Sequence, residues 1–212
     1  YQIQGDPRIS IVIANKDHVT DLKRCISSIQ ERSTYDNYEI IVVENNSESQ
    51  EIFSYYEELL ERPYDKNADC QSSENGKITV VTYKGSFNYS AINNLGVSKA
   101  TGEYILLLNN DTEVISVNWM EELLMYAQRK DVGAVGAKLY YPDRTIQHAG
   151  VVIGLGAHRT AGHTHYRQSR ENLGYMGRLC YAQDMSAVTG ACLMVRRELY
   201  QELGGLSEEL RV

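Results

Sequence analysis

The chain has 212 residues, 42% of them hydrophobic, and a formal net charge of −7. This length is sufficient for one large α/β domain with its own core. The acidic balance argues against nucleic acid as a partner, because phosphate backbones are bound through clustered Lys and Arg. No segment approaches the roughly 20 apolar residues of a membrane span, so we predict no span in this chain. The four cysteines show no close pairing, which favours a reducing compartment such as the cytoplasm.

Strands and helices alternate through the first two thirds of the chain. Short apolar runs predict strands, and apolar residues spaced by three and four predict amphipathic helices. Because strand–helix–strand connections demand parallel pairs, the pattern predicts an α/β fold with a doubly wound, mostly parallel (mixed) sheet and helices on both faces. The predicted strands are 9–14, 38–44, 78–83, 104–108 and 132–139, and the predicted helices are 19–29, 49–61, 88–100 and 119–128.

The pattern changes after residue 139. Residues 146–153 and 187–195 have the composition of two further strands. Between them lies a long segment rich in Gly, His and Arg, and a loop of this length inside a compact domain is usually functional or disordered. We predict that Gly154–Gly177 is a mobile flap beside the functional site.

The apolar run at 104–108 stops abruptly in Asn109-Asn110-Asp111. A strand buried on both faces belongs to a parallel sheet, and open α/β sheets bind ligands at the carboxyl ends of their strands. Asp111 and its neighbouring amides are hard oxygen ligands suited to Mg²⁺ or Mn²⁺ and a phosphate. The alternative is a polar turn that caps the next helix.

The second predicted strand ends in Glu44-Asn45-Asn46-Ser47, at the same edge of the sheet as Asp111. A carboxylate there could accept a hydrogen bond from a base N–H or a ribose hydroxyl. An ordinary strand-to-helix turn is again the alternative.

Taken together, these segments resemble the inverting glycosyltransferases of family 2, which have the GT-A fold. No single motif is specific, but their order and spacing are. The segments that carry the resemblance are Ile11–Lys16, Val43–Ser47, Asn93–Gly96, Leu108–Glu113, Ile146–Gly150, Ala191–Arg197 and Gly204-Gly205.

The resemblance implies transfer of a sugar from a UDP- or dTDP-sugar to an acceptor hydroxyl with inversion, assisted by Mn²⁺ or Mg²⁺. The acceptor would be a glycan or a lipid-linked glycan, in the synthesis of a bacterial surface polysaccharide such as a rhamnose-containing glycan. The enzyme would act in the cytoplasm, at the inner face of the membrane through the rest of a parent protein. Asp111 and Asn109 would hold the metal, and the donor would be bound by Ala14, Asn15, Glu44, Asn45, Asn94, Asn109, Asn110 and Asp111.

Three positions depart from the family pattern. Asn109 replaces the first Asp of the usual Asp-x-Asp motif and contributes no charge. Glu44 is one methylene longer than the usual Asp, which leaves the base preference open. Asn93 stands where many relatives carry an Arg directed at the diphosphate, a contact that Lys84 could supply instead.

The family's general base follows the segment that corresponds to Gly204-Gly205, and it would lie beyond Val212. Residues 1–212 are therefore expected to be one GT-A domain that ends before its catalytic base, as a fragment of a longer protein. General-base assistance is worth about 10²- to 10⁴-fold, so such a fragment would bind donor and transfer sugar poorly. Asp184 and His148 are the remaining candidates for an acid or base.

Other signals are open to two interpretations. His158, His163 and His165 could bind zinc, but His-x-His without a third ligand at the right spacing is weak. Arg196 and Arg197 could reach a diphosphate or simply begin a helix. Tyrosines could stack on a sugar or base, although packing is the commoner role; those considered are Tyr83, Tyr89, Tyr140 and Tyr141.

Two other functions remain. A nucleotide- or sugar-binding module that has lost its chemistry would explain Asn109 and the missing base. A sugar-phosphate nucleotidylyltransferase would need a Gly-rich, basic phosphate loop after the first strand, and residues 14–18 contain no glycine.

Overall fold

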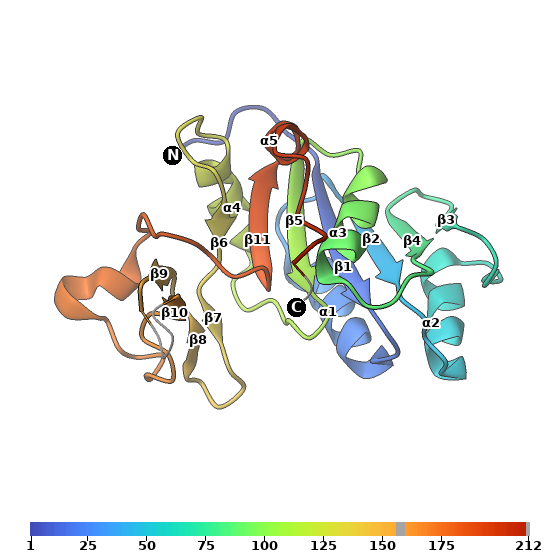
Figure 1. Cartoon of the computed structure of the whole chain (residues 1–212), viewed down its shortest axis with the longest axis horizontal. Helices are drawn as coiled ribbons and strands as arrows, with labels where there is room; N and C mark the ends of the chain where they lie inside the picture. The colour runs from blue at the N-terminus through green and yellow to red at the C-terminus, as the bar shows by residue number, and fades with distance from the viewer. Residues whose placement is uncertain (156–159, 211–212) are drawn as a thin grey trace.

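The computed structural model describes residues 1–155 and 160–210. Its centre is a seven-stranded sheet in the order β3-β4-β2-β1-β5-β11-β6 (Figure 1). In that order the strands span Cys70–Ser72, Ile78–Thr82, Tyr38–Glu44, Ile9–Asn15, Tyr104–Asn109, Cys192–Arg196 and Val135–Gly136.

The middle of this sheet is parallel and its margins are antiparallel. Strands β4, β2, β1 and β5 run in one direction. At one margin β3 pairs antiparallel with β4, and at the other β11 pairs antiparallel with β5 and β6 antiparallel with β11. The predicted α/β class with a mostly parallel, mixed sheet is confirmed. The parallel strands end at one edge, because Asn15 is in register with Glu44 and Ala14 with Asn109.

Helices cover both faces of the sheet, as predicted. The alternation of side chains along a strand sends Ile9, Ile11 and Ile13 to one face and Val12 to the other. The first face is covered by α1 (Val19–Arg32), α2 (Gln50–Leu60) and α4 (Trp119–Ala127), and the second by α3 (Tyr89–Ser98) and α5 (Arg197–Glu202).

Close packing of α3 on the sheet depends on a glycine. A Cβ at Gly96 would lie 2.4 Å from Cγ1 of Val12 and 2.8 Å from Cγ2 of Val43. Any larger residue would therefore push the helix away from β1 and β2. The Asn93–Gly96 motif thus has a packing function in addition to any contact with a ligand.

The second half of the chain differs from prediction in its strands. The predicted strand 132–139 is wrong, because Val135–Gly136 joins the main sheet while Leu139–Tyr140 (β7) pairs with Ile146–His148 (β8). The strand predicted over 146–153 is interrupted at Gly150, whose φ of +98° ends β8 before Val151–Ile153 (β9). Strand β11 begins at Cys192, so the start predicted at residue 187 is also wrong.

The segment predicted as a flap lies beyond the β6 edge of the main sheet (Figure 1). Residues 156–159 fall outside the described part of the chain. Ala161–His163 (β10) pairs with β9, and Tyr175–Cys180 forms a 3₁₀ helix, η1. The segment therefore has secondary structure of its own, and its mobility stays a prediction.

Candidate active site

Three parallel strands deliver polar residues to one edge of the sheet. Strand β1 ends at Asn15, β2 at Glu44 and β5 at Asn109. Each strand is apolar until that point, because it is buried between two helical layers, and becomes polar where the layers end. This is the edge at which open α/β sheets bind ligands.

Hydrogen bonds hold these strand ends together. The side-chain amide of Asn110 donates to Oδ1 of Asn15 at 2.7 Å, which joins the end of β5 to the end of β1. The backbone N–H of Asn45 donates to the carbonyl oxygen of Asn15 at 2.9 Å, which joins β2 to β1. Asn15 is buried and occupies the centre of the arrangement.

The turn that carries Asp111 is fastened to α1. Cys25, Ser28 and Arg32 lie on one face of that helix, because residues three and four positions apart are neighbours. The Cys25 thiol contacts Oγ1 of Thr112 at 3.4 Å, and the Ser28 hydroxyl accepts a hydrogen bond from the N–H of Val114 at 3.0 Å. Arg32 donates to the Val114 carbonyl oxygen at 2.7 Å. The backbone on the C-terminal side of Asp111 is therefore anchored at three points.

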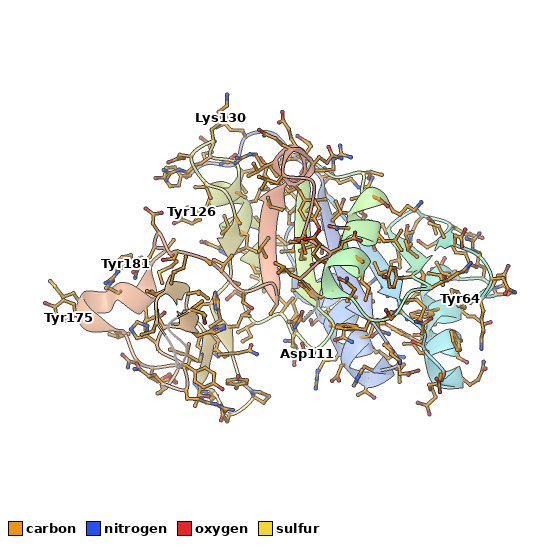
Figure 2. The ribbon with its side chains drawn as sticks, viewed as in Figure 1. Tyr64, Asp111, Tyr126, Lys130, Tyr175 and Tyr181 are labelled. Carbon is orange, nitrogen blue, oxygen red and sulfur yellow. The ribbon has the colours of Figure 1, made fainter. Side chains whose placement is uncertain are left out.

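Asp111 itself is exposed on this anchored turn. Figure 2 shows it at one edge of the sheet near α1, whereas Lys130 lies at the opposite edge. Its carboxylate enters no hydrogen bond or ion pair with the residues that the structure describes, so it is available to a ligand. The half-buried Asn109 precedes it by two residues, and its backbone N–H is bound to the Ala191 carbonyl oxygen at 3.0 Å.

These residues fit a hard divalent cation. Within residues 1–155 and 160–210, no group of three His, Cys, Asp or Glu side chains is arranged to hold a metal by itself. Mg²⁺ and Mn²⁺ suit oxygen ligands, and Mg²⁺ is usually held by one or two carboxylates together with substrate phosphates. Asp111 and the amide oxygen of Asn109 or Asn110 would supply the protein part of such a set. The cation would neutralise charge on a diphosphate.

Glu44 is turned into the protein. Only 3% of it is exposed, and its carboxylate accepts hydrogen bonds from the Ser47 N–H at 2.5 Å, the Ser47 hydroxyl at 2.6 Å and the Tyr56 hydroxyl at 2.6 Å. The predicted contact of this carboxylate with a base or ribose is therefore not the arrangement seen. Glu44 instead caps the turn after β2 and binds Tyr56 of α2.

Two residues that the sequence patterns did not single out shape the same edge. Asp17, after β1, accepts hydrogen bonds from the N–H groups of Glu48 and Ser49 at 2.8 and 2.9 Å, which joins the first two strand-end loops. Tyr56 accepts a hydrogen bond from the Asn15 amide at 3.0 Å. The available signal for Tyr56 was a phenol on the buried face of an amphipathic helix, a position that ordinary packing also explains.

The remaining donor-side candidates divide into two groups. Asn45 lies at the shared edge, and its amide donates to the carbonyl oxygens of Tyr83 and Gly85 at 3.3 and 3.1 Å. Ala14 is half-buried beside Asn109 on the neighbouring strand. Asn94, in contrast, is committed elsewhere.

All the usual hydrogen-bonding capacity of Asn94 is used by the C-terminal segment. Its amide donates to the Leu206 carbonyl oxygen and to Glu208, each at 2.9 Å. Its Oδ1 accepts from the Tyr200 hydroxyl at 2.6 Å and from the Leu206 N–H at 2.9 Å. Since an Asn side chain offers two donors and two lone pairs, none is left for a nucleotide donor. The prediction that Asn94 binds donor is corrected to a structural role.

The two candidates for an acid or base lie in different parts of the structure. Asp184 is exposed. The pKa of Arg129 is raised mainly by the hydrogen bond that Arg129 donates to Asp131, and the charge of Asp184 adds to this effect. His148 lies in β8, outside the seven-stranded sheet. The placement of Asp184 gives no support for a role at the edge that carries Asp111. His148 lies closer to that edge, because it binds the N–H of Thr189, two residues before Ala191, whose carbonyl oxygen binds Asn109.

His148 is buried and neutral. Its Nε2 accepts hydrogen bonds from the N–H groups of Gly150 at 3.3 Å and Thr189 at 3.4 Å, so the ring proton belongs on Nδ1. Nδ1 lies 3.0 Å from Nδ1 of His163. Burial, and then the neighbouring His163, lower the pKa of His148 to about 4. The pair has no third ligand for zinc within the described chain, and His158 lies outside the described residues.

The cations considered for the diphosphate are placed elsewhere. Arg196 pairs with Tyr104 at the start of β5, at the edge opposite Asp111, and Arg197 begins α5. Both arginines bind backbone carbonyl oxygens, which favours a structural role over the diphosphate interpretation. Only Arg197 lies in the helix, because Arg196 is the last residue of β11. Lys84 is exposed and pairs with Asp69 at 2.8 Å. Asn93 is buried and donates to the Tyr89 carbonyl oxygen at 2.8 Å.

Among the tyrosines considered for stacking, Tyr89 donates to the Gly190 carbonyl oxygen at 3.0 Å. Stacking on a ligand stays a prediction for all four. The cysteines Cys25, Cys70, Cys180 and Cys192 are free. No helix within the described residues has the length and apolar character needed to cross a membrane.

Comparison with known proteins identifies the family. The family model for glycosyl transferase family 2 matches residues 10–204. An uncharacterized protein, y4gI of Sinorhizobium fredii, is 41% identical over 98% of the chain. The O-antigen biosynthesis protein RfbC of Myxococcus xanthus is 37% identical over the whole chain. The chain spans 21% and 16% of the lengths of these two relatives, respectively.

A solved structure supports the fold. The mannosyltransferase PcManGT from Pyrobaculum calidifontis, in complex with GDP-Man and Mn²⁺, superimposes with a TM-score of 0.64 over 97% of this chain and 49% of its own. The sequences are 14% identical, so this likeness concerns the fold alone. With the family match over nearly its whole length and a mixed α/β sheet of GT-A type, the chain belongs to glycosyl transferase family 2.

Proposed function

We propose that this domain binds a nucleoside diphosphate sugar, UDP- or dTDP-linked, together with Mn²⁺ or Mg²⁺ at the edge formed by β1, β2 and β5. It would serve transfer of the sugar, with inversion, to a glycan or lipid-linked glycan acceptor in the synthesis of a surface polysaccharide. The relation to RfbC supports the polysaccharide context, and the complex of PcManGT with GDP-Man and Mn²⁺ supports a metal-bound nucleotide sugar.

The observation that carries this proposal is the presentation of Asp111. Its carboxylate is exposed at the end of β5, while the surrounding turn is anchored to α1 and to Asn15. A metal site built from one carboxylate needs a fixed backbone, because the remaining ligands come from the substrate. The amides around Asp111 add neutral oxygen ligands without adding negative charge that would repel a diphosphate.

The test is calorimetric titration of UDP, dTDP and GDP into the protein, with and without Mn²⁺. Asp111→Ala is expected to abolish the metal-dependent binding. Glu113→Ala is the matched control, because it removes an equal charge from the same turn, where Glu113 is ion-paired with Arg32 and exposed. Equal binding by the wild type and Asp111→Ala would refute the proposal. The nucleotide that binds would identify the base of the donor.

A second function, donor binding without efficient transfer, is favoured by the state of the other carboxylates. Glu44 and Asp17 lie at the same edge, and both are occupied by hydrogen bonds within the protein. Neither is free to take a proton from an acceptor hydroxyl. Neither Glu44 nor Asp17 is therefore the general base in this arrangement.

Single-turnover assays would separate the two functions. A protein that binds the donor and neither hydrolyses it nor passes the sugar to an acceptor glycan would act as a binding module. Transfer at a rate typical of the family would establish the enzyme. Loss of that transfer in Asp111→Ala, with Glu113→Ala unaffected, would place the reaction at the proposed metal.

A further inference from the structure

We propose that Tyr56 is a positioning residue for the donor site. Because Glu44 only accepts hydrogen bonds, Tyr56 must donate to it, and this fixes the orientation of the side-chain amides of Asn15 and Asn110. The inference rests on the proposed function and adds a residue outside the strand-end loops. It concerns a continuous chain of hydrogen bonds: Asn110 to Asn15 at 2.7 Å, Asn15 to Tyr56 at 3.0 Å and Tyr56 to Glu44 at 2.6 Å.

The direction of this chain follows from the chemistry of Glu44. An ionised carboxylate only accepts hydrogen bonds, so the Tyr56 hydroxyl must use its one proton to donate a hydrogen bond to Glu44. The Tyr56 oxygen then acts as acceptor toward Asn15, which places Nδ2 of Asn15 on that side. Oδ1 of Asn15 is left facing Asn110.

The same reasoning fixes the last amide. Because Oδ1 of Asn15 accepts, Asn110 must present its Nδ2 to it. Oδ1 of Asn110 is thereby turned away from Asn15, and it accepts no hydrogen bond from the residues that the structure describes. A free carbonyl oxygen is thus placed next to Asp111 in the turn, where it can bind the cation or accept a hydrogen bond from the nucleotide.

This chain of hydrogen bonds, called the relay below, is protected from solvent at the end that carries Glu44. Tyr56 is fully buried, and Asn15 and Glu44 are each 3% exposed. Burial above all, and then the Glu44 charge, raise the pKa of Tyr56 far above its ordinary value, so the hydroxyl stays protonated. Charge-assisted hydrogen bonds are about twice as strong as neutral ones, which makes the carboxylate end the one that sets the direction. Asn110 is half-buried and lies at the open end.

Tyr55→Phe supplies a matched control for Tyr56→Phe. Tyr55 is the preceding residue on α2, is also buried at 5% exposure, and enters no hydrogen bond with the described residues through its hydroxyl. Both variants remove one hydroxyl from a buried tyrosine and leave the ring in place. Only Tyr56→Phe interrupts the relay.

The experiment has two readouts for these variants. The first is UDP affinity in the presence of Mn²⁺, measured also in an Asn110→Ala background. The second is the side-chain amide resonances of Asn15 and Asn110 in ¹⁵N NMR spectra of the protein without ligand. We expect Tyr56→Phe to weaken binding about tenfold, to shift both resonances, and to have little further effect on affinity when Asn110 is Ala. Tyr55→Phe should change neither.

Equal affinities for Tyr56→Phe and Tyr55→Phe would overturn the inference. An undiminished effect of Tyr56→Phe in the Asn110→Ala background would also overturn it, because the tyrosine would then act through general loosening of the domain. If the wild type binds no nucleotide, the proposed function fails by itself. The resonances then decide the relay: a shift confined to Tyr56→Phe supports it, and unchanged resonances refute it.

Discussion

The side chain of Asn110 reaches from the end of β5 to Asn15 at the end of β1, with 2.7 Å between the amide nitrogen and Oδ1. This bond links the turn that carries Asp111 to the loops that follow β1 and β2. The metal-binding and nucleoside-binding parts of the proposed site are therefore held in one network. The network extends in the other direction through the contacts between the Asp111 turn and α1.

Arg32→Ala tests whether anchoring of that turn matters for binding. The substitution removes the hydrogen bond to the Val114 carbonyl oxygen and the 2.9 Å ion pair with Glu113. Because the pair is partly exposed, we expect a stability loss of no more than about 1 kcal/mol. Mn²⁺-dependent nucleotide affinity should fall about fivefold, because loss of the hydrogen bond to Val114, which Glu113→Ala retains, frees the turn that carries Asp111.

Arg24→Ala is the control for this change. Arg24 lies on the same helix but pairs with Asp21 at 2.7 Å and does not contact the turn. Affinity and thermal unfolding would be measured for both variants. If they bind nucleotide equally well, the anchoring by Arg32 is irrelevant to the site.

Much of this site could be predicted from strand ends alone. The run that stops at Asn109-Asn110-Asp111 and the run that stops at Glu44 both indicate buried parallel strands, and such strands end at a common edge. That logic places residues by backbone topology, so it is reliable for Asn15, Asn109 and Asp111. It does not determine where a side chain points. Glu44 lies at the predicted edge, yet it faces inward.

What the sequence does not reveal is the set of contacts between distant segments. Asn94 occupies a helix next to the sheet, but its role depends on a return of the chain more than a hundred residues later. The break at Gly150 depends on a backbone with positive φ, which a glycine permits but does not require. Tyr56 has the pattern of a core residue and becomes part of the site through its hydroxyl alone.

Asn94→Ala should release the C-terminal segment from α3. The substitution removes all four hydrogen bonds that link Asn94 with Tyr200, Leu206 and Glu208. We expect a loss of about 1–3 kcal/mol in the free energy of unfolding, because the buried Tyr200 and the half-buried backbone of Leu206 lose hydrogen-bond partners. Hydrogen exchange of residues 203–210 should accelerate. Ser98→Ala, at an exposed position one turn further along α3, is the control, and equal exchange in both variants would contradict this role.

The His148 pair predicts a dependence of stability on pH. Burial and the neighbouring His163 lower the pKa of His148 from 6.5 to about 4 in the folded protein. The unfolded chain therefore binds more protons between these values, so the stabilisation is complete above pH 6.5 and is lost as the pH falls towards 4. The size of this effect is about 3–4 kcal/mol, since the two pKa values differ by about 2.5 and one pKa unit corresponds to about 1.4 kcal/mol.

Urea unfolding at pH 7.5, 5.5 and 4.5 would measure this dependence. His148→Gln should be less stable at pH 7.5 and should show a shallower decline on acidification, because the group that titrates is absent. His18→Gln replaces an exposed histidine and should retain the slope of the wild type. An unchanged slope in His148→Gln would show that another group is responsible.

Arg196→Ala distinguishes a structural arginine from one that binds diphosphate. One guanidinium nitrogen donates to the carbonyl oxygens of Ala127, Arg129 and Val132 at 2.9, 2.6 and 2.9 Å. These bonds satisfy carbonyl groups at and just after the C-terminal end of α4. Strand β5 separates this position from Asn109 by five residue steps, or roughly 17 Å at the usual rise of a strand. A phosphate bound by Asp111 is therefore out of reach of this side chain.

The expected outcome is a loss of stability without a loss of binding. Three carbonyl groups would be left without a charged donor, which should lower the free energy of unfolding by about 2–3 kcal/mol. Nucleotide affinity, measured well below the lowered melting temperature, should equal that of the wild type. Lys130→Ala removes an exposed cation from the same end of the molecule and should change neither quantity (Figure 2). Weaker nucleotide binding by Arg196→Ala, with stability retained, would return the arginine to the donor site and contradict the placement of the site at the Asp111 edge.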